Sequence, residues 1–260
     1  MAIAEGVHVA SPRRPLVGTA VHIWWARLDQ TAEELEQLER TLADDERERA
    51  ARIRLKALSA RFVAVRGILR AILGRYLDVA PDHVRFRYGD SGKPALADEF
   101  AGSGLRFNLS HSHGLALYAV THAREVGVDL ERVDPRVDAA GLVGRCFSSR
   151  EQAEWSSLPD RSRGLAFLNG WTRKEAWAKA LGDGLARPLE QVEVPLRTLP
   201  AIVGVPLGGD PGCECCTLHE LAAPEPGYVA ALAIEGDAVP LATRYWPDDL
   251  ARWPALDTGT

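Results

Sequence analysis

This chain of 260 residues lacks any long apolar segment. No uncharged apolar run reaches the ~18 residues that a membrane-spanning helix needs, and residues 1–14 contain no continuous apolar stretch like that of a secretory signal. We therefore expect a cytoplasmic protein without a membrane partner. Positive charge is not in excess either, because the formal net charge is -5. A general nucleic-acid binder is normally basic, so we expect no nucleic-acid partner.

Cysteine and lysine are both scarce. Three of the four cysteines crowd into Cys213-Glu214-Cys215-Cys216, which lacks the second ligand pair of a zinc finger, so thiols in a strand or loop fit better and we assign them no function. Among 31 basic residues, lysine occurs only at positions 56, 93, 174 and 179. A compact ammonium suits a point contact with a phosphate oxygen better than a planar guanidinium does.

Apolar periodicity predicts both strands and helices. Strand-like alternation occurs at 21–25, 84–88, 105–109, 115–120 and 126–130, and further strands are expected at 192–194, 216–221 and 228–234. Helices are expected after the capping boxes Thr31–Glu34 and Ser148–Glu151, from about 45 to 76, and from 165 to a stop at Gly182 and Gly184.

Strand, turn and strand follow one another without long intervening helices, which favours an antiparallel or mixed sheet. Each half of the chain combines helix-rich sequence with several strands. We predict an α+β fold of two similar subdomains, at 16–125 and 126–247, with flexible tails at 1–15 and 248–260.

Asp129 and Glu131 share one face of a strand, because the apolar Val128 and Leu130 alternate with them. This pattern alone is typical of an exposed edge strand. Two carboxylates on one face are also well placed to hold a hard cation such as Mg²⁺, which needs few protein oxygens and completes its octahedron with water and phosphates.

Glu175 and Lys179 are four positions apart on the expected long helix, so they share a face, with Trp171 one turn earlier. A lone pair of this kind is usually a surface ion pair. If the helix lies beside Asp129 and Glu131, Glu175 becomes the third carboxylate of a cation site.

The segment Phe107–Ser112 is predicted to end a strand in hydroxyl, imidazole and backbone donors that can receive a phosphate. A Ser-His nucleophile is rejected, because adjacent residues do not face each other and the chain has no Gly-x-Ser-x-Gly motif. The expected helix from about residue 45 to 76 also carries many arginines, which by default form a solvated face and alternatively an anion-binding rim. They are Arg47, Arg49, Arg52, Arg54, Arg61 and Arg66.

Four motifs together resemble the Sfp-type 4′-phosphopantetheinyl transferases. They are Gly-Lys-Pro at 92–94, Phe-Asn-Leu-Ser-His-Ser at 107–112, Gly-Val-Asp-Leu-Glu at 127–131 and Trp-x-x-Lys-Glu-Ala-x-x-Lys-Ala-x-Gly-x-Gly-Leu at 171–185. The resemblance implies a monomer of two pseudo-symmetric halves with coenzyme A in the cleft between them. It also implies Mg²⁺-dependent transfer of the phosphopantetheine arm to a serine of an apo acyl or peptidyl carrier protein, releasing adenosine 3′,5′-bisphosphate. Mn²⁺ could replace Mg²⁺.

Carried over by motif, Asp129, Glu131 and Glu175 correspond to the metal ligands. Glu175 is also the candidate general base, and Lys179 corresponds to the contact with the pyrophosphate. The remaining expected contacts of coenzyme A are Lys93, Ser110, His111 and Lys174, with Arg47, Arg49 and Arg61 around the 3′-phosphate.

Two rival functions use the same residues. A Mg²⁺-dependent hydrolase of coenzyme A-like pyrophosphates would use water where the transferase uses serine, and a non-catalytic module would bind coenzyme A or a carrier without turnover. The sequence leaves open whether the carrier belongs to fatty-acid, polyketide or peptide synthesis.

Overall fold

A computed structural model describes residues 20–89, 92–134, 136, 138–182, 188–197, 203–206 and 215–251. The expected tail at 1–15, the stop at Gly184 and the residue Cys213 lie outside these ranges. None of the helices within the ranges has both the length and the apolar character that crossing a membrane requires.

The first half of the molecule is a four-stranded sheet in the order β10-β1-β5-β4. Its strand β1 pairs antiparallel with β5 and parallel with β10, so the predicted mixed sheet is confirmed. The strands are β1 (Val21–Arg27), β4 (Leu105–Ser112), β5 (Leu115–His122) and β10 (Leu241–Tyr245). A short hairpin of β2 (Phe86–Tyr88) and β3 (Pro94–Leu96) follows the helices of this half.

The helices of the first half are α1 (Ala32–Arg40), α2 (Asp44–Arg52) and α3 (Lys56–Leu77). The prediction of one helix from about residue 45 to 76 was wrong, because Ile53 and Leu55 are extended and separate α2 from α3. The Ala50 carbonyl accepts hydrogen bonds from the Ile53 amide and the Ser59 hydroxyl. These bonds satisfy an acceptor that an uninterrupted helix would have used itself.

The second half is a four-stranded antiparallel sheet in the order β6-β9-β8-β7. Its strands are β6 (Val126–Arg132), β7 (Val203–Pro206), β8 (Cys215–Leu221) and β9 (Tyr228–Glu235). Its helices are α4 (Ala139–Cys146), α5 (Ser149–Ser157) and α6 (Asp160–Leu181). Residues 192–194 form no strand, contrary to the prediction, since the Val194 amide donates to the buried Glu151 carboxylate instead of to a neighbouring strand.

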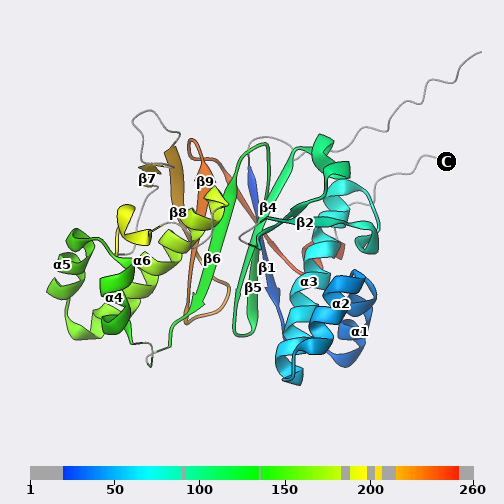
Figure 1. Cartoon of the computed structure of the whole chain (residues 1–260), viewed down its shortest axis with the longest axis horizontal. Coiled ribbons are helices and arrows are strands. Elements are labelled where there is room, and N and C mark those ends of the chain that lie inside the picture. Colours follow the sequence, from blue (N-terminus) through cyan, green and yellow to red (C-terminus); the bar gives the residue numbers. More distant parts are fainter. Residues whose placement is uncertain are drawn as a thin grey trace, which may run out of the picture.

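The two sheets lie in the middle of the molecule, with α1–α3 on one side and α4–α6 on the other (Figure 1). Ile23 and Trp25 of β1 face Val128 and Leu130 of β6 in an apolar cluster that both sheets share. The opposite face of each sheet packs against its own helices. This arrangement agrees with the predicted α+β fold.

Two of the predicted boundaries need correction. Strand β10 lies beyond residue 240 yet completes the first sheet, because its backbone pairs with β1. Residues 248–251, expected in a flexible tail, form the short helix α7 (Asp248–Ala251), and its Leu250 is buried in the first core.

Candidate active site

Strands β4 and β6 meet where the two halves join, and side chains of β4 bond to the backbone of β6. Three β6 amides donate to β4 side chains: Val128 to Asn108 (2.9 Å), Leu130 to Ser110 (3.3 Å) and Arg132 to Ser112 (3.1 Å). The predicted strand end within Phe107–Ser112 is confirmed, because β4 ends at Ser112, and its polar side chains hold β6.

This junction places the first two carboxylates. The Ser110 hydroxyl donates to Asp129 Oδ1 at 2.9 Å, and the Ser112 hydroxyl donates to Glu131 Oε2 at 3.2 Å. Asp129 and Glu131 therefore point from β6 towards β4 and stay on one face, as their alternation in the sequence predicts.

Helix α6 crosses β6 at Gly127. A Cβ atom added to Gly127 would lie 2.0 Å from the Ala176 carbonyl oxygen and 2.4 Å from the Ala180 amide nitrogen. Only glycine allows the helix to come this close to the strand. The close approach brings Glu175 and Lys179 of α6 alongside Asp129.

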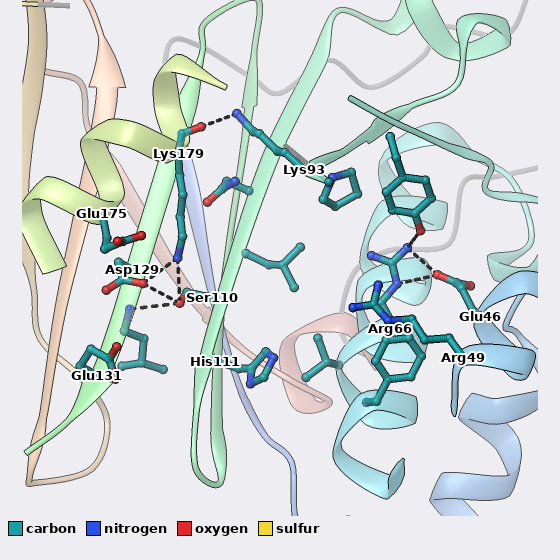
Figure 2. Close-up of a pocket in the computed structure, with 18 of the residues that line it drawn as sticks. Glu46, Arg49, Arg66, Lys93, Ser110, His111, Asp129, Glu131, Glu175 and Lys179 are labelled. Carbon is teal, nitrogen blue, oxygen red and sulfur yellow. Dashed lines mark hydrogen bonds and ion pairs between the residues drawn. The ribbon is translucent and has the colours of Figure 1, made fainter. Parts of the chain in front are cut away.

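Lys179 reaches across this contact. Its Nζ donates to Asp129 Oδ1 at 2.6 Å and to the Ser110 hydroxyl at 3.3 Å (Figure 2). Two buried carboxylate oxygens nearby have no hydrogen-bond partner among the described residues, Asp129 Oδ2 and Glu175 Oε1. The ammonium group of Lys179 is thus a single positive charge on a pocket wall that carries the three carboxylates of Asp129, Glu131 and Glu175.

The electrostatics of this wall favour a bound cation. Burial raises the pKa of Glu175, and the charges of Asp129 and Glu131 add to the rise while Lys179 opposes it. Burial and the charge of Asp129 likewise raise the pKa of Glu131, although hydrogen bonds from Ser112 and Trp171 lower it. Carboxylates held together in this way gain stability from a cation that neutralises them.

Within the described residues, no group of three or more His, Cys, Asp or Glu side chains has the arrangement of a metal centre. In this structure the ammonium of Lys179 forms an ion pair with Asp129 Oδ1. The partnerless oxygens of Asp129 and Glu175 are hard donors of the type that Mg²⁺ prefers, so the residues fit the ion chemically.

A pocket of about 1190 Å³ extends from these carboxylates to the helices of the first half. Its wall in the second half contains Asp129, Glu131, Trp171, Glu175 and Lys179. Its opposite wall contains Glu46, Arg49, Arg52, Arg66 and Tyr88. Figure 2 shows the acidic group and the arginines on opposite sides, with Ser110 and His111 between them.

His111 and Lys93 also line the pocket. Burial lowers the pKa of His111, and the charges of Lys179 and Arg61 lower it further, so the neutral imidazole is favoured. Lys93 donates to the Lys179 carbonyl oxygen at 2.5 Å, near the end of α6. Burial lowers its pKa as well, against the opposing charge of Glu125.

Lys174, expected to bind coenzyme A, points away from the pocket. Its side chain is 0% exposed, pairs with Glu151 at 2.7 Å and donates to the carbonyl oxygens of Leu189 and Val192. Successive helical residues project about 100° apart, so Glu175 and Lys174 cannot face the same site. Lys174 instead fastens the segment after α6 to the helix.

Two of the expected arginines are also absent from the pocket wall. Arg47 bonds to the Leu42 carbonyl and to Asp44 on its own helix, and neither it nor Arg61 lines the pocket. Arg49 does line it and stacks over Phe62.

Arg66 was assigned by default to a solvated face, and the structure contradicts this. It is 7% exposed and lines the pocket, next to the wholly buried Arg70. The available signal was spacing, since Phe62, Arg66 and Arg70 recur every fourth residue and therefore share the buried face of α3. Their partner Glu46 lies on α2, and the sequence around Arg66 and Arg70 does not indicate that Glu46 binds them.

Comparison with known proteins agrees with this geometry. A family model described as the 4′-phosphopantetheinyl transferase superfamily matches residues 125–233, the stretch that carries Asp129, Glu131 and Glu175. Together with a relative that is 44% identical along 92% of its own length, this match shows that the chain belongs to the 4′-phosphopantetheinyl transferase superfamily.

That relative is 4′-phosphopantetheinyl transferase HetI from Nostoc sp. strain PCC 7120, matched over 86% of this chain. The putative 4′-phosphopantetheinyl transferase slr0495 from Synechocystis sp. is 35% identical over 65% of this chain and 68% of its own length. A weaker likeness links the chain to the crystal structure of Thermotoga maritima holo-[acyl-carrier-protein] synthase, with 18% identity, a TM-score of 0.29, and coverage of 44% of this chain and 64% of that one.

Proposed function

We propose that this transferase moves the 4′-phosphopantetheine arm of coenzyme A to a serine of an apo acyl or peptidyl carrier protein and releases adenosine 3′,5′-bisphosphate, as in the Sfp-type branch of the family. The observation that carries the proposal is the pocket that both halves line, with Asp129, Glu175 and Lys179 on one wall and arginines on the other. One chain supplies both walls, which supports a monomeric enzyme.

Mg²⁺ is proposed as the bound cation, with Asp129, Glu131 and Glu175 as its protein ligands; Mn²⁺ would suit the same donors. The support is the two partnerless buried oxygens and the raised pKa values of Glu131 and Glu175. When bound, the ion would neutralise charge on the pyrophosphate as its bond breaks.

The chain's own residues supply positioning and proton transfer. Glu175 accepts the proton of the carrier serine, whose oxygen forms the new bond to phosphorus while the phosphoanhydride bond to the nucleotide breaks. A raised pKa makes Glu175 a stronger base than an ordinary carboxylate. Lys179 binds a pyrophosphate oxygen and is held in place by Asp129 and Ser110.

The nucleotide portion of coenzyme A is assigned to the rest of the pocket. His111 and Lys93 line the middle of it, and Arg49 lies on the wall of the first half. Ser110 contributes indirectly, because its hydroxyl is already bonded to Asp129.

The direct test is to incubate the protein with Mg²⁺, coenzyme A and a small panel of apo carriers, and to follow the mass of each intact carrier. We expect transfer to at least one carrier and no loss of coenzyme A without a carrier. Hydrolysis of coenzyme A in the absence of any carrier would identify the hydrolase, and binding without turnover would identify the non-catalytic module.

Asp129→Asn tests the metal assignment, because the amide keeps the shape and an acceptor oxygen for Ser110 but loses the charge. We expect transfer to fall by at least 10²-fold at low Mg²⁺, with a cooperative fold retained. Glu33→Gln, which removes an exposed acid from α1, is the matched control and should transfer at the normal rate. Unchanged turnover of the Asp129 variant at low Mg²⁺ would exclude this metal site.

A further inference from the structure

One oxygen of Asp129 is fully occupied by donors of the chain itself. Asp129 Oδ1 accepts from Lys179 Nζ at 2.6 Å and from the Ser110 hydroxyl at 2.9 Å (Figure 2). A carboxylate oxygen offers two lone pairs, so Oδ1 has none left. Asp129 Oδ2 has no hydrogen-bond partner among the described residues. A cation that binds Asp129 is therefore directed to Oδ2 and shares the carboxylate with the ammonium of Lys179.

Sharing one carboxylate brings two positive charges close together. Asp129 is 4% exposed, so little water lies around them. Charges repel more strongly in such surroundings than they do in bulk water. The ammonium of Lys179 therefore opposes a divalent cation at the same carboxylate that it stabilises.

Lys179 also reduces the negative charge that a cation would meet. Asp129, Glu131 and Glu175 bring three carboxylates to this pocket wall, and the ammonium of Lys179 pairs with the first of them. The other lysine that lines the pocket, Lys93, donates to a backbone carbonyl of α6 instead. Of these two lysines, Lys179 is the one whose charge contacts the acidic wall.

The ammonium of Lys179 still has a donor for a ligand. It carries three N–H groups, and two acceptors are recorded for it among the described residues, Asp129 Oδ1 and the Ser110 hydroxyl. The Lys179 side chain is 27% exposed and lines the pocket, whereas the Asp129 side chain is 6% exposed. The remaining N–H group can donate to a phosphate oxygen in the pocket while Asp129 keeps its bond.

We propose that Lys179 couples the binding of the metal ion to the binding of coenzyme A. In the free protein its charge lowers the affinity of the three carboxylates for Mg²⁺, and coenzyme A removes this effect because its pyrophosphate neutralises the ammonium. This inference rests on the proposed function, since it presumes that both ligands occupy the pocket. A pyrophosphate contact alone would leave metal binding by the free protein unchanged, whereas this coupling predicts that loss of the Lys179 charge strengthens it.

The test measures the affinity for Mg²⁺ by titration calorimetry, using the full chain without a carrier. The buffer is held at about pH 8, well above the ordinary pKa of a carboxyl group. Without coenzyme A, Lys179→Met should bind Mg²⁺ roughly 5- to 150-fold more tightly than the unaltered protein, the usual range of coupling between two sites. The matched control is Lys56→Met, which removes an exposed ammonium at the start of α3 and should leave the affinity for Mg²⁺ unchanged.

Two further variants separate the charge of Lys179 from its shape. Lys179→Arg keeps a positive charge, so it should bind Mg²⁺ as weakly as the unaltered protein. Should Lys179→Met fail to unfold cooperatively in urea, Lys179→Gln carries the same test, because it also removes the charge while its amide can still donate to Asp129.

Coenzyme A provides a second readout that does not depend on turnover. In the unaltered protein, saturating coenzyme A should tighten Mg²⁺ binding by roughly 10-fold or more, and Mg²⁺ should tighten coenzyme A binding by the same factor. In Lys179→Met this mutual factor should be smaller, because the repulsion that coenzyme A relieves is already absent.

Either of two outcomes would overturn the inference while metal binding and transfer stay intact. The first is a folded Lys179→Met protein that, without coenzyme A, binds Mg²⁺ no more tightly than the unaltered protein does. The second is an unaltered protein whose affinity for Mg²⁺ is the same with and without coenzyme A. Failure of the proposed function looks different, because then none of these proteins would bind Mg²⁺ under either condition and no carrier would be modified, which would overturn both.

Discussion

Gly127→Ala should disable the enzyme by moving one helix. The added methyl group would lie 2.0 Å from the Ala176 oxygen and 2.4 Å from the Ala180 nitrogen, and both are backbone atoms that cannot rotate away. Ordinary contact needs about 3.4 Å or more, so α6 must move away from β6 by more than about 1 Å.

The expected magnitudes follow from that displacement. Overpacking of this kind costs about 1–3 kcal/mol of unfolding free energy, and a backbone clash belongs at the upper end. Glu175 and Lys179 move with α6 while Asp129 stays on β6, and a misplacement of about 1 Å costs on the order of 10²-fold in rate. Binding of the nucleotide portion by the opposite wall should change much less.

The assay combines urea unfolding, the rate of transfer to an apo carrier and titration of coenzyme A. Gly164→Ala is the control, because it lies on the same helix with no heavy atom within 4 Å of the added methyl group. That variant should be more stable by roughly 0.5–1 kcal/mol and fully active. Normal kcat in a Gly127→Ala protein would refute the argument that this crossing sets the geometry of the site.

Three further predictions concern the carboxylates and Lys174. Glu175→Gln should keep kcat roughly 10²–10⁴-fold low even at saturating Mg²⁺, whereas near-complete rescue by metal would make Glu175 a ligand and not the base. The pKa of Glu175 in the folded protein lies above its ordinary value of 4.5, so the stability that this residue contributes is present below pH 4.5 and is lost as the pH rises through the folded pKa. Without metal, Glu175→Gln should therefore gain thermal stability relative to the unaltered protein as the pH increases. A stability difference that does not change with pH would contradict this. Lys174→Met leaves Glu151 buried without its cation, so the free energy of unfolding in urea should fall by about 3–5 kcal/mol while the affinity for coenzyme A stays unchanged. A fully stable variant that binds coenzyme A more weakly would instead show that Lys174 contacts coenzyme A.

The sequence by itself determined which face of its own element each acidic residue of the pocket occupies. Asp129 and Glu131 were placed on one face because strand side chains alternate with a period of two, and Glu175 and Lys179 because helical residues four apart share a face. Both periodicities act within a few residues, so one chain shows them without any partner. The same reasoning confirmed both capping boxes and the stop of α6 at Gly182.

Only the tertiary structure decided which charged groups face the pocket. Lys174 and Glu175 are neighbours, and the packing of α6 against Glu151 selects which of them is buried away from the site. Arg66 faces the pocket because Glu46, twenty positions earlier and on another helix, holds it. The pairing of β10 with β1 and the bonds from the β6 backbone to the side chains of β4 likewise depend on segments distant in sequence. Such contacts are set by packing between elements, and local periodicity carries no information about them.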